Sequence, residues 1–192
     1  MINYIGVISR EDAELLKSLA EEADRILEFG AGASTQVFSA YCKGAIDCVE
    51  TVHEWVDKTT RNLEVLQIGR NVRFLCPRPF GRVFSEIGAY DLIFVDGADE
   101  LRQSFALCSW VHLRAGGTMA FHDTRRGTPH GLSETSDVQN VCALIARCAP
   151  EIDSVILNAM DSNTTLIRKR APLPYVDWQK TEGRTDAQMG IA

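Results

Sequence analysis

Short apolar segments without a polar face alternate along this chain with longer segments of helical periodicity. Residues 90–95 are typical, because they are apolar except at Asp91 and are followed by a helical pattern over 101–111. A strand that is apolar on both sides is covered by helices on both sides, as in parallel sheets. The other expected strands are 26–29, 45–49, 72–75, 118–122, 154–157 and 164–168, and the other expected helices are 11–24, 34–41, 52–65 and 137–148. The chain is therefore predicted to fold as a doubly wound α/β domain with a mostly parallel, seven-stranded sheet.

The end of the chain departs from this alternation. Only residues 158–163 join the last two expected strands, which is too short for a crossover helix, so these strands should pair antiparallel. Residues 171–192 are rich in proline and polar residues and are expected to form an irregular tail on a single domain that spans 1–170 and begins with a short N-terminal helix. The tail also contains Tyr175 and Trp178, so we expect it, or a second copy of the chain in a homodimer, to help cover the site.

A glycine turn follows the first expected strand. The segment from Glu28 to Thr35, Glu-Phe-Gly-Ala-Gly-Ala-Ser-Thr, stands between that strand and the next helix. Ligands of doubly wound sheets bind at this place, because glycine lets the backbone approach them and the helix start offers free N–H groups. Glu50 ends the second strand, where a carboxylate can accept both hydroxyls of a ribose. The pattern predicts a nucleoside ligand; the alternative is that Gly30 and Gly32 are ordinary turn residues and Glu50 a solvated strand end.

Thr35 narrows the choice of nucleoside. The dinucleotide fingerprint needs a third glycine for close packing of the helix on the strand, and threonine stands at that position. The sequence therefore implies no pyrophosphate, which leaves a nicotinamide-dependent oxidoreductase as the third choice of function.

With these features the chain resembles the class I S-adenosylmethionine-dependent methyltransferases over about residues 11–170. LEFGAGAST is similar to their first motif, DCVET to the segment with their ribose-binding acid, and LRAGG to the turn before their fifth strand. YDLIFVDGADE followed by MAFHDT is similar to the small-molecule branch whose fourth strand ends in DGxH and fifth in HD, although Asp99 stands in place of the histidine. The resemblance implies a Rossmann-like fold and S-adenosylmethionine as cofactor. The cofactor-binding residues that it implies are Glu28, Phe29, Gly30, Ala31, Gly32, Ser34, Thr35, Glu50, Thr51 and Asp96.

Two aspartates end neighbouring strands of the expected sheet, Asp96 the fourth and Asp123 the fifth. Their carboxylates could meet beside the cofactor, and oxygen ligands suit Mg²⁺. Metal-dependent enzymes that resemble catechol O-methyltransferase use such positions, with an Asp or Asn after the second aspartate and a lysine near the end of the fourth strand. Here Thr124 follows the second aspartate, and residues 97–101 hold no lysine. We therefore do not favour Mg²⁺; without it, Asp96 would bind the amino group of the cofactor and Asp123 would cap the next turn.

Asp123 and His122 are the catalytic candidates. A base beside the methyl acceptor helps where the pKa of the acceptor is high; alternatively His122 packs against the sheet, and His130 is a second candidate base. We expect direct displacement of the methyl group by an oxygen of a small molecule, the oxygen being implied by the resemblance. The alternative is a non-catalytic cofactor-binding or assembly subunit, which the missing lysine, Thr124 and Asp99 favour.

Composition argues against other classes of protein. Twenty basic against twenty-six acidic residues give a net charge of −6 and a pI near 5.2, so nucleic acid is not an expected partner. The apolar runs are too short to cross a bilayer, and the start of the chain has no secretory pattern, so no membrane is expected. Six scattered cysteines without metal-ligand spacing predict reduced, mostly buried residues of a cytoplasmic protein. Trp55, Trp110 and Trp178 are expected only to pack.

Overall fold

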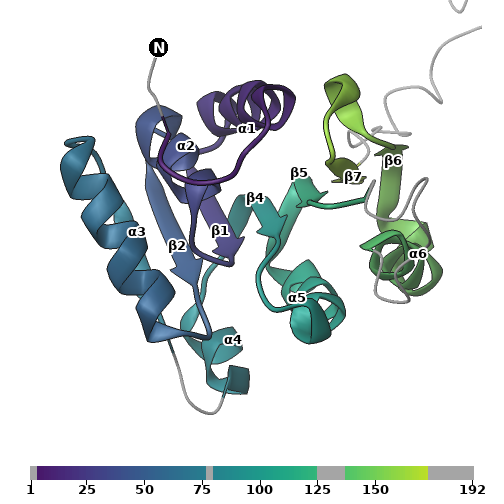
Figure 1. The fold of residues 1–192 in the computed structure, drawn as a ribbon. Helices are drawn as coiled ribbons and strands as arrows, with labels where there is room; N and C mark the ends of the chain where they lie inside the picture. Colours follow the sequence, from purple (N-terminus) through teal and green to yellow (C-terminus); the bar gives the residue numbers. More distant parts are fainter. Residues whose placement is uncertain (1–3, 77–79, 125–136, 173–192) are drawn as a thin grey trace, which may run out of the picture.

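The computed structural model describes residues 4–76, 80–124 and 137–172. In it the chain forms a seven-stranded sheet with helices on both faces (Figure 1). The strands are β1 (Arg25–Phe29), β2 (Ala45–Val49), β3 (Val72–Leu75), β4 (Tyr90–Val95), β5 (Leu113–Phe121), β6 (Ile152–Ile156) and β7 (Thr165–Lys169), in the order β3-β2-β1-β4-β5-β7-β6. The pairs from β3 to β5 are parallel, whereas β7 runs antiparallel to both β5 and β6. The predicted doubly wound fold and its antiparallel last pair are confirmed.

Within the part of the chain that the structure describes, six α-helices cover this sheet in two layers. The helices are α1 (Arg10–Glu22), α2 (Ala33–Tyr41), α3 (His53–Val65), α4 (Val83–Glu86), α5 (Arg102–Ser109) and α6 (Asp137–Cys148). One layer holds α1 and α2, with α3 beside α2, and the other holds α4, α5 and α6 (Figure 1). Helix α1 begins one residue before the predicted range of 11–24. Its start is capped, because the Asp12 amide donates to Ser9 Oγ at 2.9 Å and the Ser9 hydroxyl donates to Asp12 Oδ2 at 2.6 Å.

Each buried strand contributes side chains to two hydrophobic cores, because neighbouring side chains along a strand point to opposite faces of the sheet. In β1, Ile26 packs with α1 and α2, whereas Leu27 and Phe29 pack with α4, α5 and α6. The same alternation separates Phe94 from Val95 in β4. This two-sided burial explains why these strands show no polar face in the sequence.

Three local predictions differ from the structure. Strand β5 begins at Leu113 rather than at residue 118, so residues 114–117, expected as a turn, belong to the strand, and its pairing with β4 shifts register between Tyr90 and Leu92. Helix α5 is shorter than expected, because 3₁₀ turns over Asp99–Leu101 and Trp110–His112 flank it. Helix α4 was not predicted, since a single turn is too short to show helical periodicity.

The cysteines only partly fit the prediction of core residues. Cys42, Cys48 and Cys148 are buried, but Cys108 on α5 and Cys142 on α6 are exposed. His130 and tail residues 173–192 lie outside the described residues, so the tail and the homodimer stay predictions. Within the described ranges, no helix combines the length and apolarity that a bilayer crossing needs.

Candidate functional site

The ends of four parallel strands align at one edge of the sheet. Phe29 pairs with Val49 on one side and Val95 on the other, and Val95 pairs with Phe121. The residues that follow these aligned ends are Gly30, Glu50, Asp96 and His122. The strand register therefore brings together residues that are far apart in the sequence.

A cavity of about 550 Å³ opens over this edge. Most of the predicted site residues line it, namely Gly30, Ala31, Gly32, Ser34, Glu50, Thr51, Asp96, His122 and Asp123. Another cavity, of about 410 Å³, lies at the opposite edge, beside the starts of β4 and β5, and is lined by none of the predicted residues.

The glycine turn needs its two glycines for different reasons. Gly30 has a φ of +97°, and a Cβ there would lie 2.5 Å from the backbone nitrogen of Gly97, so the two loops touch. A Cβ at Gly32 would meet nothing within 4 Å, because this residue faces the cavity. Gly30 thus serves the fold, and Gly32 keeps space open for a ligand.

Glu50 is bound to the glycine turn. Its Oε2 accepts a hydrogen bond from the Ala31 amide at 2.9 Å, and its Oε1 accepts from the amides of Thr51 and Val52 at 2.5 and 3.0 Å. The carboxylate is buried, yet it lines the cavity. Four backbone and hydroxyl groups, counting the Thr51 hydroxyl at 3.1 Å, thus hold one carboxylate in place.

Three predicted cofactor residues lie beneath the cavity rather than on its surface. Phe29 is fully buried and stacks on Phe105, with ring centroids 4.4 Å apart, so its side chain belongs to the core. Thr35 is also fully buried, and its Oγ1 accepts from the Gly32 amide at 2.9 Å. Both side chains therefore support the glycine turn from inside the protein and do not face the cavity.

Glu28 is the third of these residues and is an unusual buried carboxyl. Burial raises its pKa to about 8 against the hydrogen bond from the Ser34 hydroxyl, which is 2.6 Å from Oε1. Its Oε2 has no hydrogen-bond partner among the described residues. A buried acid of this kind favours a cationic group nearby, because a positive charge would offset its desolvation.

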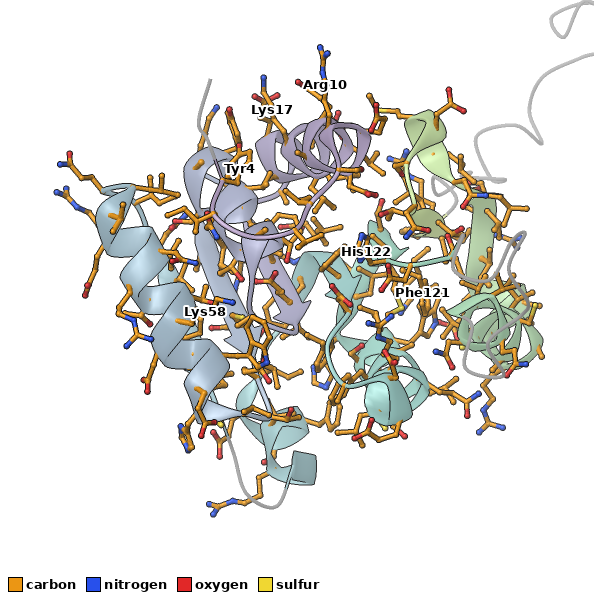
Figure 2. The ribbon with its side chains drawn as sticks, in the orientation of Figure 1. Tyr4, Arg10, Lys17, Lys58, Phe121 and His122 are labelled. Carbon is orange, nitrogen blue, oxygen red and sulfur yellow. The ribbon has the colours of Figure 1, made fainter. Side chains whose placement is uncertain are left out.

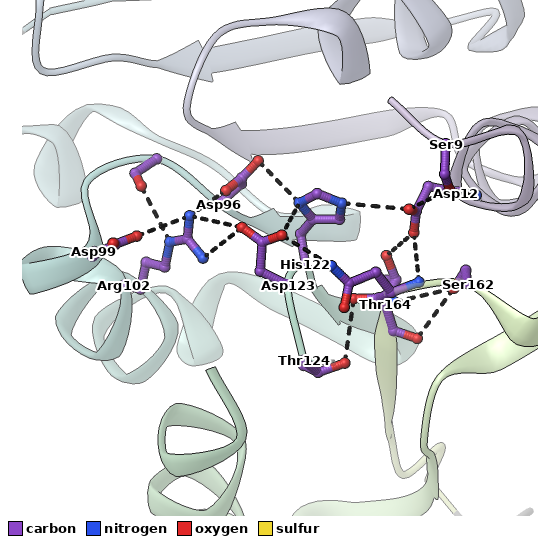
Figure 3. A network of polar contacts seen from close by, with 12 residues as sticks. Ser9, Asp12, Asp96, Asp99, Arg102, His122, Asp123, Thr124, Ser162 and Thr164 are labelled. Carbon is purple, nitrogen blue, oxygen red and sulfur yellow. Dashed lines mark hydrogen bonds and ion pairs between the residues drawn. The ribbon is translucent and has the colours of Figure 1, made fainter. Parts of the chain in front are cut away.

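On the other side of the cavity, His122 is surrounded by carboxylates (Figure 3). Nε2 lies 3.6 Å from Asp12 Oδ2, and Nδ1 lies 3.4 Å from Asp96 Oδ2 and 3.5 Å from Asp123 Oδ1. Burial opposes the charge on the ring, but the three aspartates outweigh it and raise the pKa of His122 to about 10. This shift favours the protonated ring. The ring also lies beside Phe94 of β4, with centroids 5.9 Å apart, so the catalytic and the packing interpretations of His122 both stay predictions.

Arg102 lies on the far side of Asp96 and Asp123 from this ring (Figure 3). Nη2 donates to Asp96 Oδ1 at 2.5 Å, and Nη1 lies 3.5 Å from Asp123 Oδ2. Burial opposes ionisation of Asp96, but His122 and Arg102 together lower its pKa. Neither Arg102 nor Asp12 was expected here, because α5 and α1 reach the site only through tertiary packing.

Thr124 follows the second aspartate in the sequence, but Asn163 is the residue whose side chain contacts Asp123. The Thr124 hydroxyl donates to Asn158 Oδ1 at 3.0 Å and accepts from Thr165, so it is engaged with the segment around β7. Asn163 precedes β7, and its Nδ2 donates to Asp123 Oδ1 at 3.0 Å. Asp123 itself has a φ of +60°, which aspartate tolerates. The antiparallel return of β7 brings Asn163 to this place, which no local pattern indicates.

Two further parts of the cavity wall were missed. Residues 5–8 line it, held by Gln36, whose side chain accepts from the Ile5 amide at 2.8 Å and donates to the Ile5 carbonyl at 2.7 Å. Trp55 on α3 also lines it and is 47% exposed, so the prediction that it only packs is wrong. Lys58, which stacks on Trp55, lies across β1 from His122 in Figure 2.

Comparisons with known proteins agree with this architecture at the level of fold. No family model matches the chain, and no curated protein matches it. Among solved structures, it is similar to the O-methyltransferase TomG from Streptomyces achromogenes, in complex with S-adenosylmethionine, with 17% identity, a TM-score of 0.68, and 86% of this chain and 82% of that one covered. The fold is that of the class I methyltransferases.

Two other structures support the same assignment of fold. The O-methyltransferase from Bacillus cereus, in complex with S-adenosylhomocysteine, has 16% identity and a TM-score of 0.67 over 85% of this chain and 83% of that one. The methyltransferase PaMTH1 from Podospora anserina, also bound to S-adenosylhomocysteine, has 21% identity and a TM-score of 0.64 over 85% and 80%. The methyltransferase fold thus spans β1 to β7 of this chain.

Proposed function

We propose that this chain is an S-adenosylmethionine-dependent methyltransferase that methylates an oxygen of a small molecule. One observation carries the proposal: the glycine turn and Glu50 form a single hydrogen-bonded unit on one wall of the cavity, joined by the Ala31 amide. The oxygen acceptor rests on the resemblance of the strand-end motifs and on the O-methyltransferases among the similar structures.

The residues of this wall fit the parts of the cofactor. Glu50 Oε2 accepts one bond in the structure, so this oxygen can accept another from a ribose hydroxyl. Gly32 leaves room where any larger residue would enter the cavity. The unpartnered Oε2 of Glu28, just below the turn, would be stabilised by the positive charge of the cofactor's amino group or sulfur.

The chain has little covalent chemistry to perform. When bound, S-adenosylmethionine supplies a methyl group made electrophilic by a positively charged sulfur. The cavity would have to hold the acceptor in line with that methyl group and keep water away. Because the three aspartates raise the pKa of His122, the ring favours keeping its proton, which disfavours it as the group that takes the acceptor's proton.

A non-catalytic cofactor-binding subunit is the second candidate function. It is favoured by the opposite wall of the cavity, where the pKa of His122 is raised and Arg102 is engaged with carboxylates. Such a site could retain the cofactor while lacking a free base for transfer.

Calorimetric titration with S-adenosylhomocysteine, followed by transfer of labelled methyl to a panel of small phenols, alcohols, carboxylic acids and amines, tests both candidates. Binding together with transfer to an oxygen supports the proposed function. Binding without transfer to any member of the panel supports the non-catalytic subunit. If S-adenosylhomocysteine does not bind while a nicotinamide dinucleotide does, both are wrong.

A further inference from the structure

The guanidinium of Arg102 stands at the point where the carboxylates of Asp96 and Asp123 converge. Arg102 begins α5 and is only 4% exposed. Its Nε donates to the Gly97 carbonyl at 3.1 Å, which turns the side chain back toward the end of β4. Figure 3 shows the carboxylates of Asp96 and Asp123 on one side of the guanidinium, and Asp99, 3.1 Å away, on the other.

This arrangement sets a fixed positive charge against both carboxylates that a divalent cation would need. Ligand atoms of Asp96, Asp123 and His122 lie within 4.8 Å of one another, close enough to share an ion. Mg²⁺ must approach its oxygen ligands to about 2.1 Å, and here the guanidinium already contacts one oxygen of each carboxylate. A second cation at this point would meet the positive charge of Arg102 at close range.

The remaining expected ligand position is also unavailable. Thr124 Oγ1 is bound to Asn158 and Thr165 instead of facing Asp123. The amide nitrogen of Asn163, which cannot ligate a metal, is the atom that faces Asp123 Oδ1. The residues present therefore do not fit the divalent metal that the two strand-end aspartates imply.

We infer that Arg102 is the resident cation of this site, a positioning residue that holds Asp96 and Asp123 in place of a divalent metal. Its planar fork can contact two carboxylates at once, which a lysine ammonium could not do in the same way. As a statement about methyl transfer the inference rests on the proposed function, because it makes that transfer independent of metal. As a statement about metal binding alone, the inference does not depend on the proposed function.

Titration with Mn²⁺, which accepts the same oxygen ligands as Mg²⁺, tests this inference through the electron paramagnetic resonance signal of the free ion. Wild-type protein should leave the signal unchanged. Arg102→Met, which keeps an unbranched side chain like the aliphatic stem of arginine but removes the guanidinium, should bind Mn²⁺ at least about tenfold more tightly than wild type. Adding Asp123→Asn to that variant should abolish the gain.

Arg114→Met is the matched control, because Arg114 also pairs with an aspartate, Asp91, at 2.6 Å, but at the opposite edge of the sheet. This variant should resemble wild type in the titration. Removing a buried cation from two carboxylates is strongly destabilising, so Arg102→Met is also followed by circular dichroism. If it unfolds, Mn²⁺ should restore its structure by supplying the missing charge.

Three results would overturn the inference. These are tight Mn²⁺ binding by wild type that Asp123→Asn removes, a folded Arg102→Met that gains no affinity, and an unfolded Arg102→Met that Mn²⁺ does not restore. Binding of S-adenosylhomocysteine to wild type is measured in parallel. Its absence would count against the proposed function and leave the metal result standing.

Discussion

The two walls of the cavity are built in different ways. The wall that carries the glycine turn and Glu50 comes from one stretch of chain, residues 28–51, and is held by hydrogen bonds to backbone amides. The opposite wall is made of polar side chains from α5 and from the residues that follow β4 and β5. Asp12 of α1 and Asn163, 151 residues apart, support it from behind. A wall formed by one short stretch of chain depends on few residues. A wall that combines side chains from several elements changes its chemistry when any one of those residues is replaced.

The first wall should lose its ligand most completely at Gly32. In Gly32→Val the side chain enters the open cavity, so affinity for S-adenosylhomocysteine should fall by about a hundredfold or more in calorimetry, with little change in unfolding temperature. Gly30→Ala is the contrasting variant, because its Cβ meets Gly97 and its φ is +97°, so it should cost more than about 2 kcal/mol of stability. If a folded Gly32→Val variant binds S-adenosylhomocysteine with unchanged affinity, the cofactor does not bind at this wall.

Glu50→Ala should weaken the same wall less severely. Loss of a charge-assisted acceptor should cost about 1.5–3 kcal/mol of cofactor affinity, or about ten- to a hundredfold. Glu54→Ala, an exposed acid nearby on α3, is the control and should bind normally. Calorimetry that finds the same affinity in both variants would contradict the assignment of Glu50 to the ribose.

The charged groups of the second wall should make the stability of the fold depend on pH. The pKa of His122 is raised from 6.5 to about 10, so its charge stabilises the fold fully below pH 6.5, and this contribution is lost as the pH rises through about 10. The pKa of Asp12 is lowered from 3.8 to about 2 by His122, Ser9 and Thr164 against the effect of burial, so its contribution is lost as the pH falls through about 2.

His122→Gln should therefore cost roughly 2 kcal/mol of unfolding free energy at pH 6 and much less at pH 10. Urea unfolding of both proteins across this range measures the difference. His53→Gln, a change at an exposed histidine of α3, should leave the pH profile of wild type unaltered. A His122 ring that loses its proton near pH 6.5 in NMR spectra would show that the three carboxylates do not act together.

The smallest effect is expected at the rim of the first wall. Trp55→Ala should weaken S-adenosylhomocysteine binding by about threefold, since the ring covers one side of the cavity but stays half exposed. Val65→Ala changes another exposed apolar residue of α3, outside the cavity, and should have no effect. If both variants bind alike, Trp55 has no part in the site.

Sequence pattern alone determined the sheet, its layers and the first wall, because those features depend on local periodicity and on short-range turns. The apolar residues 26–29 predict a strand buried on both faces, and the glycines that follow predict a turn. Neither prediction depends on the rest of the chain. The same logic placed Glu50, Asp96 and His122 at strand ends that the parallel register then aligned.

Only the tertiary structure decided the state of the second wall. Asp12 carries the pattern of a helix cap, and it also reaches His122 because α1 packs beside the end of β5. Arg102 is an ordinary helix residue in the sequence and becomes the partner of Asp96 and Asp123 through the turn between β4 and α5. Charges interact through space with a strength set by distance and burial, and neither quantity is encoded in the spacing of residues along the chain.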